Sequence, residues 1–291
     1  MLPEALKPGG SGVIKNSERK PFAGFGGSDR ETHSRKGGSM TSRRPDALEP
    51  MLRKLRLWAR LDASDEQALM ELPHDIVTIG KQRTLVNEGD LVTHCWLMIS
   101  GFCVRYKIVG DGGRQIVSVH MLGDLVDLQN ALLGVADHGV QALTECEMAK
   151  IPIEAIRRLT DRRPKVKDAL WYDTLVDGSI FREWVANVGR RDSKTRIAHL
   201  LCEFALKLDA VHMGEQLNYE LPMTQEQLAD ATGLTPVHVN RMLQTLAKEG
   251  LIERVTSKSV VIGNWQRLAE AGDFDRSYLH LDAAQRRAGS H

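Results

Sequence analysis

Residues 224–250, TQEQLADATGLTPVHVNRMLQTLAKEG, constrain the fold of this chain more than any other stretch of its sequence. Thr224, followed three positions later by Gln227, forms the pattern of a capping box, which begins a helix. Gly233 interrupts the helical pattern, and Thr235 before a proline is a suitable N-cap for a second helix. The stretch therefore predicts two short helices joined by a glycine turn, the helix-turn-helix arrangement.

The second of these helices has one apolar and one polar face. Apolar side chains recur at i, i+3, i+4 and i+7, which is the spacing of a buried stripe: Val239, Met242, Leu243 and Leu246. An ordinary surface hairpin of helices, the alternative interpretation, would more often carry Glu and Lys on its outer face. The hydrogen-bonding groups found there instead favour insertion into the major groove of DNA. The candidate DNA-contact residues of this region are Gln225, Thr235, Val237, His238, Arg241 and Gln244.

Composition limits the interpretation without deciding it. A chain of 291 residues with 42% hydrophobic residues has room for about two domains, each with a core. The net charge is +1, and residues 189–264 contain nine Lys or Arg against nine Asp or Glu. Bulk charge therefore gives no argument for nucleic acid, and the DNA-binding prediction depends on residue pattern alone.

The sequence contains neither a run of 18 apolar residues nor an apolar signal core at its N-terminus. Its four cysteines are scattered, without zinc-ligand spacing or the pattern of a disulfide scaffold. We therefore expect a cytoplasmic protein that has no membrane partner.

Residues 74–152 contain at least seven short runs rich in Val, Ile and aromatic residues, separated by turn sequences. Asp111-Gly112 is a strong hairpin signal. Short strands at this spacing predict an antiparallel sandwich or barrel.

The elements before and after this β region set the predicted domain boundaries. We expect a disordered tail over residues 1–40, a β sensor domain with flanking helices over 41–163, a long helix over 164–189, a winged helix-turn-helix domain over 190–280, and a tail over 281–291. Residues 251–262 predict a two-stranded hairpin, the wing, with Lys258 near its tip as a further candidate DNA contact.

The long helix carries more apolar residues than one domain face requires, which predicts dimerisation through a second face. The candidate dimerisation residues are Leu170, Ile180 and Trp184. A strict heptad seam through them would also contain Asp173 and Asp177, and buried unpaired carboxylates are costly. We therefore expect the seam to be splayed or rotated at those positions.

This order of elements resembles the Crp–Fnr superfamily of bacterial transcription regulators, most specifically through GRRDSKTRIAHLLCEF, LPMTQEQLADATGLTPVHVNRMLQTLAKEGLI and, more weakly, MLGDLVDLQNALLG. The resemblance covers residues 46–280. It implies an α+β fold with an N-terminal antiparallel β-roll (double-stranded β-helix-like), a long dimerisation helix and a C-terminal winged helix-turn-helix. It also implies a homodimer that is not an enzyme, that binds a two-fold-symmetric operator on double-stranded DNA and that contacts RNA polymerase.

The same resemblance implies how the second helix reads DNA. Family members typically offer a Glu to cytosine and, four residues later, an Arg to guanine. The matching positions here are Val237 and Arg241, so the guanine contact is kept and the cytosine contact is lost.

The sequence departs from the family in its sensor region. Members that bind cyclic AMP carry a Gly-Glu pair where this chain has Asp127-Leu128, and later an Arg-Ser or Arg-Thr where residues 137–140 contain no arginine. No cysteine precedes Cys95, so the N-terminal cluster that holds iron–sulfur in the oxygen-sensing branch is absent. We expect no cofactor, no metal and no cyclic AMP binding, and leave open an unidentified small-molecule effector.

Two other interpretations remain from the residues. One is a metal-, haem- or redox-responsive site in the β region, built from His94, His120, His138, Cys95, Cys103 and Cys146. Free cysteines are more often buried small hydrophobes. A β-roll metalloenzyme would need an H-x-H pair on one strand, and none of the predicted strands has one. The other is a β-roll interaction module without DNA binding, against which the intact helix-turn-helix argues.

Overall fold

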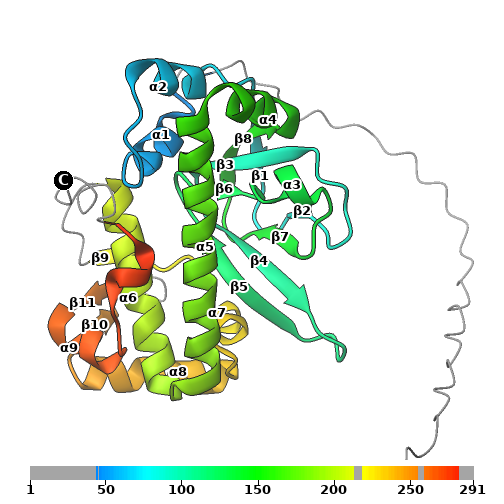
Figure 1. The fold of residues 1–291 in the computed structure, drawn as a ribbon. Helices are drawn as coiled ribbons and strands as arrows, with labels where there is room; N and C mark the ends of the chain where they lie inside the picture. Colours follow the sequence, from blue (N-terminus) through cyan, green and yellow to red (C-terminus); the bar gives the residue numbers. More distant parts are fainter. Residues whose placement is uncertain (1–43, 45, 213–217, 255–258, 282–291) are drawn as a thin grey trace, which may run out of the picture. The chain divides into compact units, whose positions relative to one another are not determined.

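The computed structural model describes residues 44, 46–212, 218–254 and 259–281 (Figure 1). Within these residues the predicted fold class is confirmed: an antiparallel β-roll, a long helix and a winged helix-turn-helix follow one another. The tails predicted over residues 1–40 and 281–291 lie outside the described residues, apart from Leu281, which packs against the core. Among the described helices, none is both long and apolar enough to cross a membrane.

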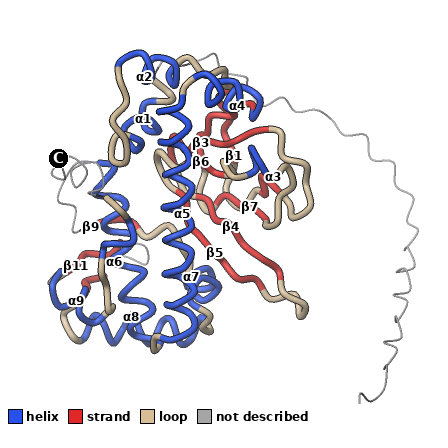
Figure 2. The backbone as a smooth tube through the Cα atoms, in the orientation of Figure 1, coloured by secondary structure: helices blue, strands red, loops and turns tan. Residues whose placement is uncertain are grey.

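The β-roll consists of two four-stranded antiparallel sheets, which Figure 2 shows as the main group of strands. Its strands are β1 (Asp75–Ile79), β2 (Thr84–Val86), β3 (His94–Ser100), β4 (Cys103–Ile108), β5 (Arg114–His120), β6 (Leu125–Val126), β7 (Gly139–Ala142) and β8 (Cys146–Pro152). One sheet has the order β1-β8-β3-β6 and the other β2-β7-β4-β5. The predicted hairpin joins β4 to β5, and Gly112 at its tip has a φ of 84°, which favours glycine.

Small and flexible side chains fill the space between the two sheets. Met98, Cys103, Val140 and Met148 are completely buried there. A short helix α3 (Asn130–Leu133), which the sequence analysis did not anticipate, follows β6. Its four residues are too few to show a helical period.

Two short helices precede the roll, and two more connect it to the C-terminal domain. The first two are α1 (Glu49–Leu55) and α2 (Ala63–Met70), and the connecting two are α4 (Ile153–Arg162) and the long α5 (Pro164–Arg190). Asp62 caps α2 by accepting hydrogen bonds from the backbone N–H groups of Ser64 and Asp65. Helix α5 contacts α1, α2 and α4 at one end, and β5 and α6 further along. A single helix therefore touches both the sensor region and the helix that leads into the C-terminal domain.

The C-terminal domain consists of α6 (Ser193–His212), β9 (Asn218–Glu220), α7 (Gln225–Thr232), α8 (Pro236–Lys248), β10 (Ile252–Arg254), β11 (Ser259–Ile262), α9 (Trp265–Ala271) and a 3-10 helix η1 (Arg276–Leu279). The wing is a three-stranded sheet with the order β10-β11-β9, so the prediction of a two-stranded hairpin was incomplete. Strand β9 has only three residues, and its partner β11 lies far along the chain. Nothing local in the sequence marks it as a strand.

Residues after α9 fold back onto the molecule. Leu279 is fully buried, and η1 packs against α5. The Tyr278 hydroxyl donates to Glu203 Oε2 at 2.8 Å, and Trp184 Nε1 donates to the same carboxyl at 3.0 and 3.1 Å. Burial raises the pKa of Glu203.

Candidate nucleic-acid interface

The turn between α7 and α8 has the local geometry that its sequence predicts. Thr224 Oγ1 accepts from the backbone N–H of Gln227, and the Gln227 side chain accepts from Thr224 N in return, which completes the capping box. Gly233 ends α7 with a φ of 65°, in the left-handed region. Thr235 Oγ1 then accepts from the N–H of His238 at 3.3 Å and caps α8. The predicted helix-turn-helix is therefore present.

One face of α8 is buried against the domain core. Val239, Leu243 and Leu246 are buried as the i, i+4 and i+7 spacing predicts, whereas Met242 is only partly buried at the edge of the core. Because this stripe anchors α8, the opposite face is turned outward.

The outward face of α8 carries most of the predicted DNA-contact residues. Val237 is 81% exposed, and Arg241 and Gln244 are also exposed. His238 is partly buried: its Nε2 lies 3.0 Å from Arg241 Nη2 and 3.3 Å from Ser193 Oγ. His238 therefore links Arg241 to the start of α6 and helps to orient it.

The remaining predicted contacts lie at the ends of the two helices. Thr235 is exposed at the N-terminus of α8, and its hydroxyl is used in the cap. The partly buried Gln225 donates from Nε2 to Asn240 Oδ1 at 3.1 Å, so it joins α7 to α8. Lys258 lies outside the described residues.

Sequence reasoning missed the residues that support this surface from α6. Asp192 caps α6 by accepting from the N–H groups of Lys194 and Thr195. Arg196 Nη1 donates to the carbonyl of Thr232 at 3.0 Å, at the end of α7. The motif GRRDSKTR contains these residues and could have pointed to them, because polar side chains at a helix start commonly form caps.

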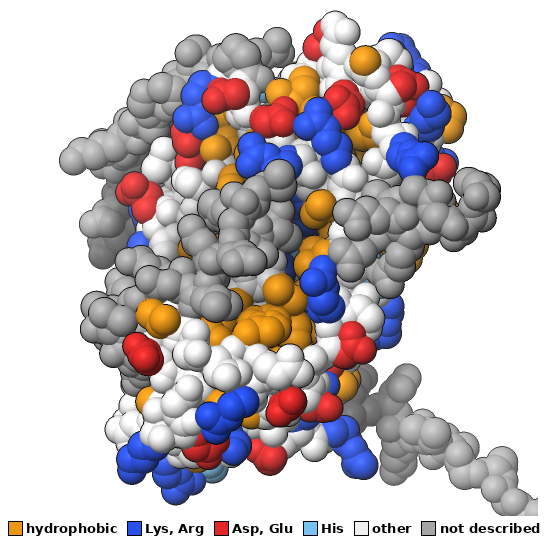
Figure 3. Space-filling view, turned by 90° about the vertical axis from the view of Figure 1, so that its left-hand side faces the viewer, with side chains coloured by type: hydrophobic (Ala, Val, Ile, Leu, Met, Phe, Trp, Pro, Cys, Tyr) orange, Lys and Arg blue, Asp and Glu red, His pale blue; other side chains and the backbone are white. Residues whose placement is uncertain are grey.

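Basic side chains are visible at the lower end of the molecule in Figure 3, the end at which Figure 1 shows α8. Acidic side chains lie among them, as the balanced composition predicts.

Helix α5 has two apolar faces, and the candidate dimerisation residues lie on the inner one. Leu170 and Trp184 are 4% and 6% exposed, and Ile180 packs against both large cores. Leu170 and Trp184 therefore pack inside the chain, which leaves little of either side chain exposed for the partner contact that the sequence predicts. The exposed apolar side chains of α5 are Trp171, Leu175, Phe181 and Val185. The surplus of apolar residues on this helix is visible in the sequence, but which of them the rest of the chain covers is not.

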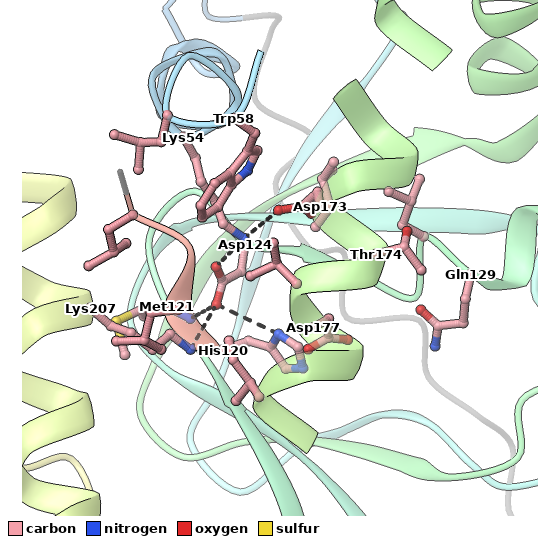
Figure 4. A pocket seen from close by; sticks show the side chains of 17 residues that line it. Lys54, Trp58, His120, Met121, Asp124, Gln129, Asp173, Thr174, Asp177 and Lys207 are labelled. Carbon is pink, nitrogen blue, oxygen red and sulfur yellow. Dashed lines mark hydrogen bonds and ion pairs between the residues drawn. The ribbon is translucent and has the colours of Figure 1, made fainter. Parts of the chain in front are cut away.

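The predicted conflict over Asp173 and Asp177 is resolved by ion pairs inside the chain. Lys54 Nζ lies 2.9 Å from Asp173 Oδ1 and 2.8 Å from Asp124 Oδ1, beside a small cavity of about 50 Å³ (Figure 4). Burial by itself lowers the pKa of Lys54, but the two carboxylates more than offset this and raise it. For Asp173 burial prevails and raises the pKa. Asp177 is paired with Arg105, so the carboxylates of Asp173 and Asp177 both have a cation within the chain.

The position aligned with the cyclic AMP pair holds a buried aspartate. Asp127 has a φ of 67°, a region that favours glycine, and its side chain is completely buried. Its Oδ1 lies 2.8 Å from His138 Nε2 and 3.5 Å from Arg105 Nε. An arginine therefore does reach this region, from β4 and not from residues 137–140, and a carboxylate already lies beside it.

The histidines and cysteines of the roll do not converge. His94 bonds with Thr93, His120 with Ser118, and His138 with Asp127 and Asp137. All four cysteines are free and buried, and burial raises the pKa of each thiol: Cys95, Cys103, Cys146 and Cys202. Among the described residues, no three His, Cys, Asp or Glu side chains are grouped so that they could hold a metal ion. Buried thiols with raised pKa values are poor nucleophiles.

Two family models match the chain, one on each side of α5. Residues 76–163 match the cyclic nucleotide-binding domain, and residues 195–271 match the Crp-like helix-turn-helix domain. The first match covers the β-roll, and the second covers most of α6, the helix-turn-helix, the wing and α9.

Curated relatives match over two thirds or more of the chain. The transcriptional activator protein FnrL of Cereibacter sphaeroides is 27% identical over 226 residues, which are 76% of this chain and 90% of FnrL. The nitrogen fixation regulation protein FixK of Bradyrhizobium diazoefficiens is 27% identical over 201 residues, 68% of this chain and 83% of FixK. The fumarate and nitrate reduction regulatory protein of Escherichia coli K12 is 25% identical over 201 residues, covering 68% and 79%. These relatives are regulators, which agrees with the prediction that the chain is not an enzyme.

Solved structures share the fold. FixK2 from Bradyrhizobium japonicum superposes with a TM-score of 0.62 and 22% identity, covering 69% of this chain and 98% of FixK2. The regulator CLP of Xanthomonas campestris superposes with a TM-score of 0.56 and 17% identity, covering 70% and 100%. With its β-roll, its long helix and its Crp-like helix-turn-helix domain in this order, the chain belongs to the Crp–Fnr superfamily of bacterial transcription regulators.

Proposed function

We propose that this regulator binds, as a homodimer, an operator with two-fold symmetry, and that α8 reads its sequence in the major groove. The observation that carries the proposal is the outward face of α8, on which Val237, Arg241 and Gln244 are exposed while the opposite stripe is buried. A helix held in this way presents its first turns to base edges.

Arg241 supplies the main sequence contact. An arginine at this position pairs in a bidentate way with O6 and N7 of guanine. Its guanidinium is within hydrogen-bond distance of His238, which limits its freedom before DNA arrives. Val237 has no acceptor for cytosine N4 and suits a thymine methyl group. The half-site therefore keeps the guanine of the family and loses the cytosine preference beside it.

Contacts to phosphate position the helix. Thr235 lies at the N-terminus of α8 and Gln225 at that of α7, where free backbone N–H groups favour anions. Lys258, on the wing, adds a salt-dependent contact. These contacts set orientation and affinity without specifying bases.

The dimer forms through the exposed apolar face of α5. Trp171, Leu175, Phe181 and Val185 are each about half exposed or more, which leaves apolar surface at several points along one helix. Packing two copies of this surface together removes it from water and sets the half-sites about 34 Å apart, one helical turn of DNA.

Cyclic AMP is not the effector. Arg105 is a cation that reaches the aligned region, and Asp127 lies beside it. A phosphate would meet the buried Asp127 carboxylate, which retains its charge because Arg105 and His138 lower its pKa against the effect of burial.

As a regulator in the cytoplasm, the protein contacts RNA polymerase next to its operator.

The experiment that tests this proposal is selection of bound sequences from random DNA by the full chain, followed by fluorescence anisotropy on the selected site. We expect a two-fold-symmetric site with a guanine in each half. Changing Val237→Glu should add a cytosine preference next to that guanine, because the carboxylate accepts from cytosine N4. Selection that yields no common sequence would reject sequence-specific binding.

A further inference from the structure

A cavity of about 420 Å³ lies between the roll and α5. Its lining includes Arg105, Gln129 and His138 from the roll, and Thr174, Asp177 and Phe181 from α5. The Arg105 side chain is 9% exposed. A nearly buried guanidinium beside a cavity has the chemistry to bind an anion, because its charged N–H groups form strong hydrogen bonds with anionic oxygens.

Three groups from this chain surround that guanidinium. Arg105 Nη1 donates to Asp177 Oδ2, Nη2 donates to Gln129 Oε1 at 3.2 Å, and Nε lies 3.5 Å from Asp127 Oδ1. Asp127 is in turn bonded to His138. Among these partners Asp177 differs, because it belongs to α5 while the others belong to the roll.

Asp177 also differs in exposure. Its side chain is 35% exposed, whereas that of Asp127 is completely buried. Burial would raise the pKa of Asp177, but the positive charge of Arg105 outweighs this and brings the pKa to about 2. The carboxylate is therefore ionised at neutral pH and lies at the wall of the cavity.

We propose that Asp177 is a built-in anion: its carboxylate takes the place on Arg105 that a small carboxylate ligand would take, and so fastens α5 to the roll without a free effector. Because Asp177 is tethered to the same chain, it competes at a high effective concentration against any dissolved anion. Regulators that need a ligand to join these two elements would respond to its concentration. In this protein the ligand group is part of the helix.

Shortening this side chain tests the proposal on the full-length protein. In Asp177→Ala, Arg105 loses its partner from α5 and a space the size of a carboxylate opens. We expect a melting temperature lower by about 4 °C or more. Sodium formate should restore part of this loss, compared with sodium chloride at equal ionic strength. Formate is the probe because it is the smallest carboxylate.

Matched variants show whether the rescue depends on Arg105. Asp168→Ala removes an exposed carboxylate from the same helix and should melt like the wild type, without a formate effect. Asp177→Asn keeps the shape but not the charge, so it should be less stable and remain unresponsive to formate. Adding Arg105→Gln to Asp177→Ala should abolish the rescue.

Two results would overturn the proposal. One is an Asp177→Ala protein that melts like the wild type; the other is one that gains no more from formate than from chloride. If Asp177→Ala does not fold, Asp177→Asn decides: a wild-type melting temperature for that variant would exclude a role for the charge.

DNA binding adds a second readout that rests on the proposed function. Affinity for the selected operator should fall in Asp177→Ala and recover with formate, because the fastened α5 orients the DNA-binding domain. Unchanged operator affinity in Asp177→Ala would show that the fastening does not reach the DNA-binding domain, and would overturn that part of the proposal. If the wild type binds no DNA at all, the proposed function fails, and the melting experiment still judges Asp177 separately.

Discussion

Arg105 and Arg241 are the same residue type in opposite situations. Arg105 lies in the roll, nearly buried, and its charge is matched by Asp127 and Asp177. Arg241 is exposed on α8, and its guanidinium lies within hydrogen-bond distance of the His238 ring. The location of a charged side chain therefore decides whether it stabilises the fold or remains available to a partner. A charge neutralised inside the chain holds elements together, whereas one left at the surface is available for DNA.

The same contrast separates the two faces of α5. Leu170 and Trp184 are covered by the roll and α6, while Trp171 and Phe181 are exposed. Changes in interior groups should therefore lower stability, and changes in exposed groups should alter assembly or DNA binding while the fold persists.

The largest effect should come from removing Lys54. In Lys54→Met the carboxylates of Asp124 and Asp173 lose their shared cation, and breaking such a pair in a mostly buried site costs about 3 kcal/mol of unfolding free energy. Urea denaturation measures this loss. Lys167→Met, an exposed change on α5, is the control and should cost little. Equal stability of the two variants would mean that the Lys54 cluster contributes nothing to folding.

The next largest effect should come from the exposed face of α5. Replacing Trp171 and Phe181 together by Glu puts charge into the proposed dimer contact, so light scattering should report a monomer. Operator affinity should fall about 100-fold, because each DNA-binding domain then binds its half-site without being linked to a second one.

The control for that change replaces Leu91 and Leu132 by Glu, since both are highly exposed apolar residues outside α5. This control should keep the oligomeric state of the wild type. A double α5 variant that still scatters as a dimer would show that another surface forms the contact.

Arg241→Ala should have a smaller effect, which is confined to DNA binding and leaves the stability of the fold unchanged. We expect a loss of about 1–3 kcal/mol in binding and a relaxed preference at one base pair per half-site. Anisotropy titrations against substituted operators measure both. Arg158→Ala, an exposed arginine on α4, should leave affinity and preference unchanged. If Arg241→Ala keeps the selected half-site and the affinity, another face of α8 lies in the groove.

The smallest effect should be a pH dependence at Glu203. Its pKa is raised by burial, so the folded state binds its proton more tightly than the unfolded state does. The stabilisation from this site is complete below its ordinary pKa of 4.5 and is lost as pH rises through the folded pKa. Glu203→Gln removes this loss while its amide oxygen can still accept from Trp184 and Tyr278.

The stability of Glu203→Gln relative to the wild type should therefore increase as pH rises above 4.5. Melting temperatures across this range measure the difference between the two proteins. A constant difference would mean that Glu203 has the same pKa in the folded and unfolded states.

Local patterns in the sequence determined a large part of this protein. The capping box at Thr224, the glycine turn at Gly233 and the stripe from Val239 to Leu246 specify the helix-turn-helix, because caps, turns and helical periods depend on residues a few positions apart. The turn at Gly112 and the strand-like runs likewise predicted an antiparallel sandwich or barrel. The exposed arginine of α8 followed from the same period.

Which side chains of those elements are buried, paired or exposed depends on how the chain packs. Strand β9, the burial of Leu170 and Trp184, and the pairing of Lys54 and Arg105 with carboxylates of α5 all involve residues distant in sequence. A helical period shows that α5 has apolar residues on several sides, but not which side the roll covers. Burial and ion pairing depend on neighbours brought together by folding, and for that reason the inner and outer faces of α5 could be assigned only from the packed chain.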